Sequence, residues 1–217
     1  DAEPLMCFSE LIALVERESD AAGRLFGLVV ELKHASYFES IGLPMRELYG
    51  NALSEAGWSH SAQLTTESFE STILAQLRDR GVGGELVYLL EASGYPIDRV
   101  IEHGTDAKSY EYDVSDDGLR ELTSVVSGIS IDKSMLVSED GDAGTSITER
   151  AHALGLTVLT WTLRPENEYL SPAYTRGTTG FGDWRGEFAA VMRSGVDGVF
   201  ADHPDPALEV RKELFGR

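Results

Sequence analysis

Short apolar runs alternate along the chain with segments in which apolar residues recur every three or four positions. Continuous apolar runs are typical of strands buried in a parallel sheet, and the three-to-four spacing indicates amphipathic helices. The runs predict six strands, at residues 25–33, 62–69, 86–91, 128–133, 156–162 and 198–202. The helical spacing predicts helices at residues 4–18, 43–56, 70–80, 115–126, 145–153, 184–193 and 206–214.

Strands that alternate with helices indicate a parallel sheet covered by helices. We therefore expect a single α/β domain over residues 1–217. Two architectures fit this pattern. The six strand–helix units could be part of a (β/α)8 barrel, which needs eight, or they could form an open doubly wound sheet with no unit missing. The pattern alone does not separate these alternatives.

Two long connections leave the carboxyl ends of predicted strands, which is the functional side of such folds. They span residues 92–114 and 164–183. The second connection is rich in Gly, Thr and Tyr, so it could be either a mobile lid or a plain surface loop.

The first apolar run ends abruptly in polar residues. Leu25–Val30 is followed by Glu31, Leu32, Lys33 and His34. Because Glu31 and Lys33 are two positions apart, their side chains would point to the same side of a strand. A metal-binding carboxylate beside a phosphate-binding ammonium is one explanation, and a surface ion pair at a strand end is the other.

The other predicted strands also end in polar or aromatic residues, namely Glu67, Ser68, Glu91, Asp132, Lys133, Trp161 and Asp202. Converging strand ends would bring several of these side chains around one mouth. Carboxylates in such a place suit a hard divalent cation, which prefers oxygen ligands. The indole of Trp161 could line a pocket there or pack in the core between sheet and helix.

The charge of the chain argues against several classes of partner. The formal net charge is -19, with 37 acidic and 18 basic residues, and such a field repels nucleic acid and anionic membranes. No apolar stretch approaches the roughly 20 residues that span a bilayer. Cys7 is the only cysteine, which excludes an intrachain disulfide. The compartment stays open between secreted, periplasmic and cytoplasmic.

Several common catalytic and binding motifs are absent. Residues 113–118 look briefly like a calcium loop, but Ser124 stands where the bidentate Glu of an EF-hand belongs. The glycines at 177–182 are not followed by the Lys-Ser/Thr of a P-loop, and no Gly-x-Ser-x-Gly elbow occurs. The five histidines have no zinc-binding spacing.

Four segments, in the right order, resemble glycerophosphodiester phosphodiesterases. Residues 31–33, Glu-Leu-Lys, are similar to the Glu-Ile-Lys of that family. Residues 67–70, Glu-Ser-Phe-Glu, resemble its Gln-Ser-Phe-Glu, with Glu67 in place of Gln. Residues 151–167 are similar to a late strand that carries a pocket tryptophan, and residues 195–204 resemble the closing strand.

This resemblance implies a distorted (β/α)8 barrel, of which this chain would hold six units, strands three to eight. It also implies hydrolysis of glycerophosphodiesters to glycerol 3-phosphate and an alcohol, with Ca²⁺ or Mg²⁺ as the metal. Glu31 would be a metal ligand and Lys33 a phosphate contact. Phe69 and Trp161 would line the glycerol pocket, where Glu67 would be a polar residue with an added negative charge.

The sequence departs from the family in one large respect. The family's His-Arg-Gly, its Glu-x-Asp metal pair and its second catalytic His-Asp do not occur. We therefore expect no catalytic acid or base in this chain, and weak or no activity of the chain alone. Two unpaired strand edges would then need an N-terminal segment or a second copy of the chain. The alternative is a non-catalytic binding or assembly module derived from the barrel.

Overall fold

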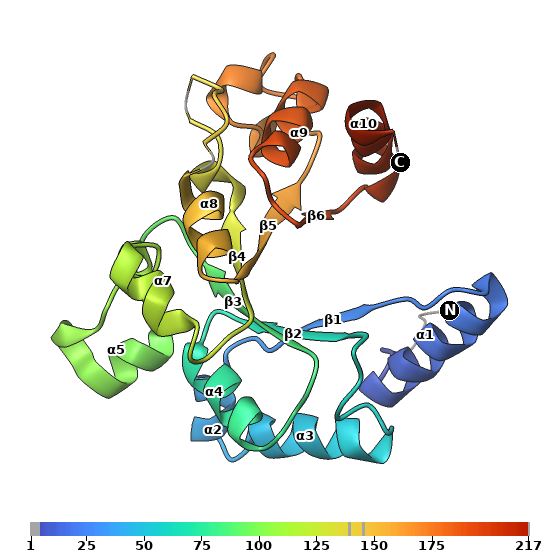
Figure 1. The fold of residues 1–217 in the computed structure, drawn as a ribbon, viewed down its shortest axis with the longest axis vertical. Helices are drawn as coiled ribbons and strands as arrows, with labels where there is room; N and C mark the ends of the chain where they lie inside the picture. Colours follow the sequence, from blue (N-terminus) through green and yellow to red (C-terminus); the bar gives the residue numbers. More distant parts are fainter. Residues whose placement is uncertain (1–4, 139, 145, 217) are drawn as a thin grey trace. The chain divides into compact units, whose positions relative to one another are not determined.

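The computed structural model describes residues 5–138, 140–144 and 146–216 (Figure 1). Pro4 and Thr145, the expected first residues of two helices, lie outside them. The chain divides into two compact units. The first comprises residues 1–89 and 96–107, and the second comprises residues 90–95 and 108–217. The expectation of a single domain stays a prediction.

Three parallel strands in sequence order form the sheet of the first unit. The last residue of the third strand already belongs to the second unit. The elements are α1 (Phe8–Ala22), β1 (Leu28–Glu31), α2 (Ala35–Ser40), α3 (Met45–Glu55), β2 (Leu64–Ser68), α4 (Ser71–Asp79), β3 (Glu85–Leu90), α5 (Ile97–His103) and the 3-10 helix η1 (Gly104–Asp106).

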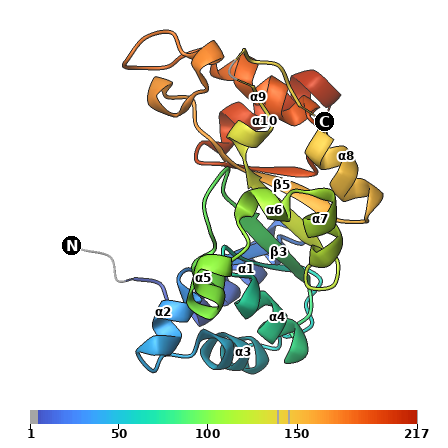
Figure 2. The ribbon, with the colours of Figure 1, turned by 90° about the vertical axis from the view of Figure 1, so that its left-hand side faces the viewer.

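Helices α3 and α4 lie side by side and supply much of the core of the first unit (Figure 2). Leu53 of α3, Leu74 and Leu77 of α4, and Leu64 of β2 are fully buried. Burial of such side chains stabilises the fold by about 1.5–3 kcal/mol each. Each helix places its apolar residues three or four positions apart, so one face is buried while the other carries charged residues.

Three parallel strands in sequence order also form the sheet of the second unit. Its elements are α6 (Tyr110–Asp113), α7 (Asp116–Leu122), β4 (Gly128–Asp132), η2 (Lys133–Met135), α8 (Ser146–Ala153), β5 (Thr157–Leu163), η3 (Asn167–Tyr169), η4 (Pro172–Tyr174), α9 (Trp184–Arg193), β6 (Gly198–Ala201) and α10 (Pro204–Phe215). Ser115 caps α7 as expected, since its Oγ accepts a hydrogen bond from Gly118 N at 3.1 Å. No helix of the described residues is both long and apolar enough to cross a bilayer.

The six predicted strands and seven predicted helices are all present, with ends shifted by a few residues. The first strand differs most. It covers only Leu28–Glu31, so the expectation that Lys33 lies on the strand is wrong. The expectation that this run is buried on both faces is also wrong, because Leu25 is 74% and Val29 43% exposed. Within the described residues β1 pairs with β2 alone, which leaves its other flank open.

Candidate functional site

The end of β2 fixes the backbone that follows β1. Leu32 N donates a hydrogen bond to Glu67 O at 2.8 Å, and Ser68 Oγ donates to Leu32 O at 2.8 Å. Ser68 is fully buried, and its Oγ also accepts a hydrogen bond from Glu70 N at 3.1 Å. The two segments that resemble the family motifs are therefore joined directly.

A second set of hydrogen bonds holds the start of α2. Ser36 N donates to Glu70 Oε2 at 2.9 Å, and Ser36 Oγ donates to the same oxygen. His34 links Lys33 to α2 in the left-handed conformation, with φ at 55°, which is uncommon for residues other than glycine. The segment that carries Glu31 and Lys33 is thus held by Ser68 on one side and by Glu70 on the other.

Glu31 and Lys33 form an ion pair at the carboxyl end of β1. Lys33 Nζ donates to Glu31 Oε2 although Lys33 lies in the turn beyond the strand. The Lys33 side chain remains 65% exposed, so its ammonium can reach an anion in solvent. Glu31 is mostly buried, and its Oε1 is buried without a hydrogen-bond partner among the described residues.

Glu67 lies directly opposite Glu31, because the two residues pair in the parallel register of β1 and β2. It is only 6% exposed, and its Oε2 also finds no hydrogen-bond partner in the described part of the chain. Burial, and secondly the negative charge of Glu31, raise the pKa of Glu67 to about 7, while Lys33 acts in the opposite direction. A buried carboxyl group with an unpaired oxygen is uncommon and needs an explanation.

The two unpaired oxygens of Glu31 and Glu67 are suitable ligands for a hard cation such as Ca²⁺ or Mg²⁺. They are only part of a coordination shell, since Ca²⁺ takes about six to eight oxygens. No group of three or more His, Cys, Asp or Glu side chains with metal-binding geometry occurs among the described residues. Substrate, water or further carboxylates would have to complete the shell.

Phe69 and Trp161 stay predicted pocket residues. Phe69 is half-buried in the bend between β2 and α4 of the first unit. Trp161 belongs to the second unit, where it pairs in register with Asp132. It is also half-buried, and its indole N–H donates to Ser130 O at 3.2 Å.

The strand ends of the second unit are occupied by paired charges. Lys133 Nζ donates to Glu187 Oε2 at 2.7 Å and also to Tyr169 O. Asp132 Oδ1 accepts a hydrogen bond from Ser134 N at 2.8 Å. Burial and the charge of Asp132 raise the pKa of Glu91. A groove of about 690 Å³ adjoins this region, lined by residues that include Asp132, Lys133, Tyr169 and Ser171.

The connection at residues 164–183 is an organised loop held at its base by Asn167. Asn167 N donates to Gly180 O at 2.9 Å and its Nδ2 donates to Thr179 O at 2.6 Å. Its Oδ1 accepts from Arg176 N at 2.8 Å. Buried Glu187 of α9 adds an anchor, because its Oε1 accepts from both N and Oγ of Ser171 at 2.6 Å. Asn167 ends the segment 151–167 that resembles the family, but nothing in that segment predicted its anchoring role, and no sequence motif marked Glu187.

One histidine–aspartate pair occurs on the side of the second unit that is opposite to the strand ends. His152 Nε2 lies 2.9 Å from Asp197 Oδ2, which also accepts a hydrogen bond from Val158 N at 2.8 Å. Asp197 precedes β6 and Val158 is at the start of β5. Conserved chemistry in barrels occurs at the carboxyl ends of strands, so this pair is best explained as structural.

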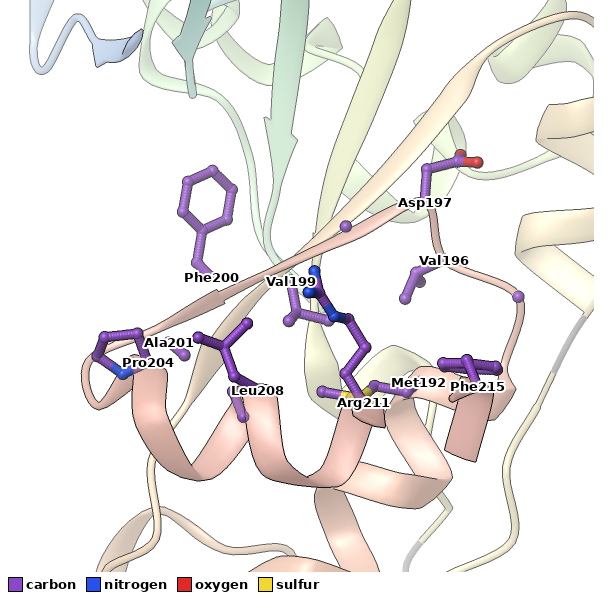
Figure 3. A pocket seen from close by; sticks show the side chains of 13 residues that line it. Met192, Val196, Asp197, Val199, Phe200, Ala201, Pro204, Leu208, Arg211 and Phe215 are labelled. Carbon is purple, nitrogen blue, oxygen red and sulfur yellow. The ribbon is translucent and has the colours of Figure 1, made fainter. Parts of the chain in front are cut away.

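An apolar groove of about 920 Å³ runs along β6 and α10 (Figure 3). Val199, Leu208 and Phe215 line it, and Arg211 points from α10 toward β6. Within the described residues β6 pairs with β5 alone, so this groove is the open flank of an edge strand. Its lining is mainly apolar but includes Asp197 and Arg211, and it contains none of the predicted site residues.

No protein-family model matches the chain, and no curated protein matches its sequence. Solved structures do match it. A protein from Silicibacter pomeroyi, assigned as a glycerophosphoryl diester phosphodiesterase, is 18% identical with a TM-score of 0.62, over 95% of this chain and 56% of that one. The glycerophosphodiester phosphodiesterase from Parabacteroides distasonis is 16% identical with a TM-score of 0.57, over 95% of this chain and 64% of that one. The glycerophosphodiester phosphodiesterase from Agrobacterium tumefaciens is 15% identical with a TM-score of 0.52, over 92% of this chain and 61% of that one.

At these identities the likeness concerns the fold. It favours six units of a (β/α)8 barrel over an open doubly wound sheet, because it covers nearly all of this chain. The chain spans only 56–64% of the length of these structures. The resemblance predicted from the sequence motifs is thus confirmed, and the chain has the fold of glycerophosphodiester phosphodiesterases.

Proposed function

We propose that the intact protein hydrolyses glycerophosphodiesters to glycerol 3-phosphate and an alcohol in a metal-dependent reaction. The observation that carries this proposal is the Glu31–Lys33 pair, which the ends of β1 and β2 hold on a fold shared with such enzymes. The position agrees with the rule that barrel chemistry takes place at the carboxyl ends of strands.

The residues of this chain would bind and orient the substrate. The exposed ammonium of Lys33 would contact the phosphate as a charge-assisted hydrogen-bond donor. Glu31 would hold a Ca²⁺ or Mg²⁺ ion, which, when bound, would screen the charge of the phosphate. Phe69 and Trp161 would line the glycerol pocket, a role that rests on the family resemblance.

This chain alone would be weakly active or inactive. The histidines that act as acid and base in the family have no counterpart in its sequence. General acid–base catalysis contributes about 10²–10⁴-fold to such reactions, so its loss would remove most of the turnover.

The test compares the product of the complete gene with the 217-residue chain on glycerophosphocholine, with Ca²⁺ or Mg²⁺ supplied. We expect release of glycerol 3-phosphate by the former and little by the latter. Lys33→Ala in the complete protein should lower kcat/KM at least about tenfold. Lys212→Ala, which removes an exposed lysine of α10, is the matched control and should have no such effect.

Substantial turnover by the 217-residue chain would show that its own residues supply the acid and base. Binding of a metal or of glycerophosphate without turnover by the complete protein would reject hydrolysis. That second result would support the alternative of a binding or assembly module derived from the barrel.

A further inference from the structure

Glu67 is the residue at which this chain departs from the family motif that it otherwise matches, and its surroundings differ from those of an ordinary pocket residue. It pairs in register with Glu31, so two carboxylates occupy neighbouring positions at the ends of β1 and β2. Two like charges at this spacing repel each other unless a proton or a cation lies between them.

The hydroxyl groups on either side of Glu67 in β2 are bonded elsewhere. The Oγ of Ser68 donates to Leu32 O, and the hydroxyl of Thr66 is 2.8 Å from that of Tyr49. Lys33 bonds to Glu31 Oε2 and leaves Glu31 Oε1 and Glu67 Oε2 without partners among the described residues. Leaving such an oxygen buried and unpaired destabilises the fold, and more so when the oxygen is charged.

The charges of Glu31, Glu67 and Lys33 also favour a bound cation. Two carboxylates face a single ammonium, and that ammonium is mostly in solvent. A divalent cation between Glu31 and Glu67 would neutralise both carboxylates and supply a partner for each unpaired oxygen. Carboxylate oxygens are the ligands that Ca²⁺ and Mg²⁺ prefer.

We infer that Glu31 and Glu67 together bind one divalent cation of the oxygen-preferring class, with Glu67 as a second metal ligand. This inference rests on one part of the proposed function, the assignment of Glu31 as a metal ligand. It gives Glu67 a different role from the one expected in the glycerol pocket.

Isothermal titration calorimetry of the product of the complete gene with CaCl₂ and with MgCl₂ tests this inference without any turnover. Glu67→Gln keeps the shape of the side chain and removes its charge, and it should weaken cation binding at least about tenfold. Glu31→Gln should weaken it similarly. Glu39→Gln removes one charge from the exposed face of α2 and should leave the affinity within about twofold, because solvent screens that charge.

The outcomes distinguish the metal role of Glu67 from that of Glu31. If Glu67→Gln binds the cation as the wild type does and Glu31→Gln does not, Glu67 is not a ligand while the metal role of Glu31 stands. If neither substitution weakens binding, or if the wild-type protein binds neither cation, both assignments are wrong. Glu67→Asp provides a second variant if Glu67→Gln does not fold, and its shortened carboxylate should also weaken binding.

Discussion

Two of the three buried glutamates among the described residues have opposite surroundings, Glu67 in the first unit and Glu187 in the second; the third, Glu70, holds the start of α2 through its Oε2. Every carboxylate oxygen of Glu187 has a partner, with two hydrogen bonds from Ser171 and one from Lys133. Glu67 Oε2 has none in the part of the chain that the structure describes. The two side chains are nearly equally inaccessible, at 6% and 0% exposure.

This difference separates a structural group from a group kept for a ligand. A buried charge that is fully paired fixes the elements around it, and its loss leaves other buried groups without partners. Glu187 joins α9, η2 and the loop after β5 in this way. An unpaired oxygen on a buried carboxyl group stabilises nothing by itself, and where it faces a second carboxylate, as in Glu67, a bound ligand explains it best.

The largest expected effect is that of Glu187→Ala. The substitution leaves the ammonium of Lys133 without its charged partner and the N–H of Ser171 without its acceptor, so the free energy of unfolding should fall by about 3–5 kcal/mol. Urea unfolding followed by circular dichroism measures it. Glu168→Ala, at an exposed residue of the same loop, is the control and should stay within about 0.5 kcal/mol of the wild type. A loss as small for Glu187→Ala as for this control would contradict the structural role.

Glu67→Gln should have the opposite effect when no metal is present. The raised pKa means that folded Glu67 binds a proton more tightly than unfolded Glu67, so wild-type stability should fall as the pH rises from 4.5 to about 7. The variant lacks this penalty and should be more stable than the wild type above that range, by up to about 3 kcal/mol.

Urea unfolding in EDTA at several pH values measures the difference in unfolding free energy between Glu67→Gln and the wild type. This difference should vanish below pH 4.5. The control Glu39→Gln should show no comparable pH-dependent gain. A Glu67→Gln variant that is less stable than the wild type at every pH would show that Glu67 has partners like those of Glu187.

Ser68→Ala tests the connection between the two motif segments. It removes the donor to Leu32 O and the acceptor of Glu70 N, so the free energy of unfolding should fall by about 1–3 kcal/mol. Ser40→Ala removes an exposed hydrogen bond to Tyr37 O and should cost less than about 0.5 kcal/mol. Equal losses in urea unfolding would mean that the buried hydroxyl of Ser68 does not hold the two segments together.

The smallest effect on stability should come from Lys33→Ala. The ion pair with Glu31 is exposed on the lysine side, and such pairs contribute about 0–1 kcal/mol. Urea unfolding at neutral pH measures the change. A loss as large as that of Glu187→Ala would place Lys33 with Lys133 as a structural cation and would remove the case for a phosphate contact.

The alternation of strands and helices was predictable because apolar periodicity reports burial directly. Three short helices, α2, α5 and α6, were missed because four to seven residues carry too little periodicity to be recognised. The burial of β1 was overestimated because its sequence does not reveal that one flank lacks a neighbouring strand.

The sequence pointed to Glu31, Lys33 and Glu67 because each lies close to the end of a predicted strand. It could not reveal what surrounds them. The bonds from Ser68 to Leu32 and from Ser36 to Glu70 join residues that are 36 and 34 positions apart, and no local pattern encodes such pairs. The same holds for Lys133 and Glu187, which are 54 positions apart.

The bonds that Asn167 makes to residues 176, 179 and 180 have a consequence for how this protein can diversify. A loop that is fastened largely through backbone groups depends less on the exact side chains of its interior. The segment between residues 168 and 178 could therefore change in composition while the strands beneath it stay as they are, as long as Ser171 keeps its bonds to Glu187. Selection on such a loop could proceed separately from selection on the core.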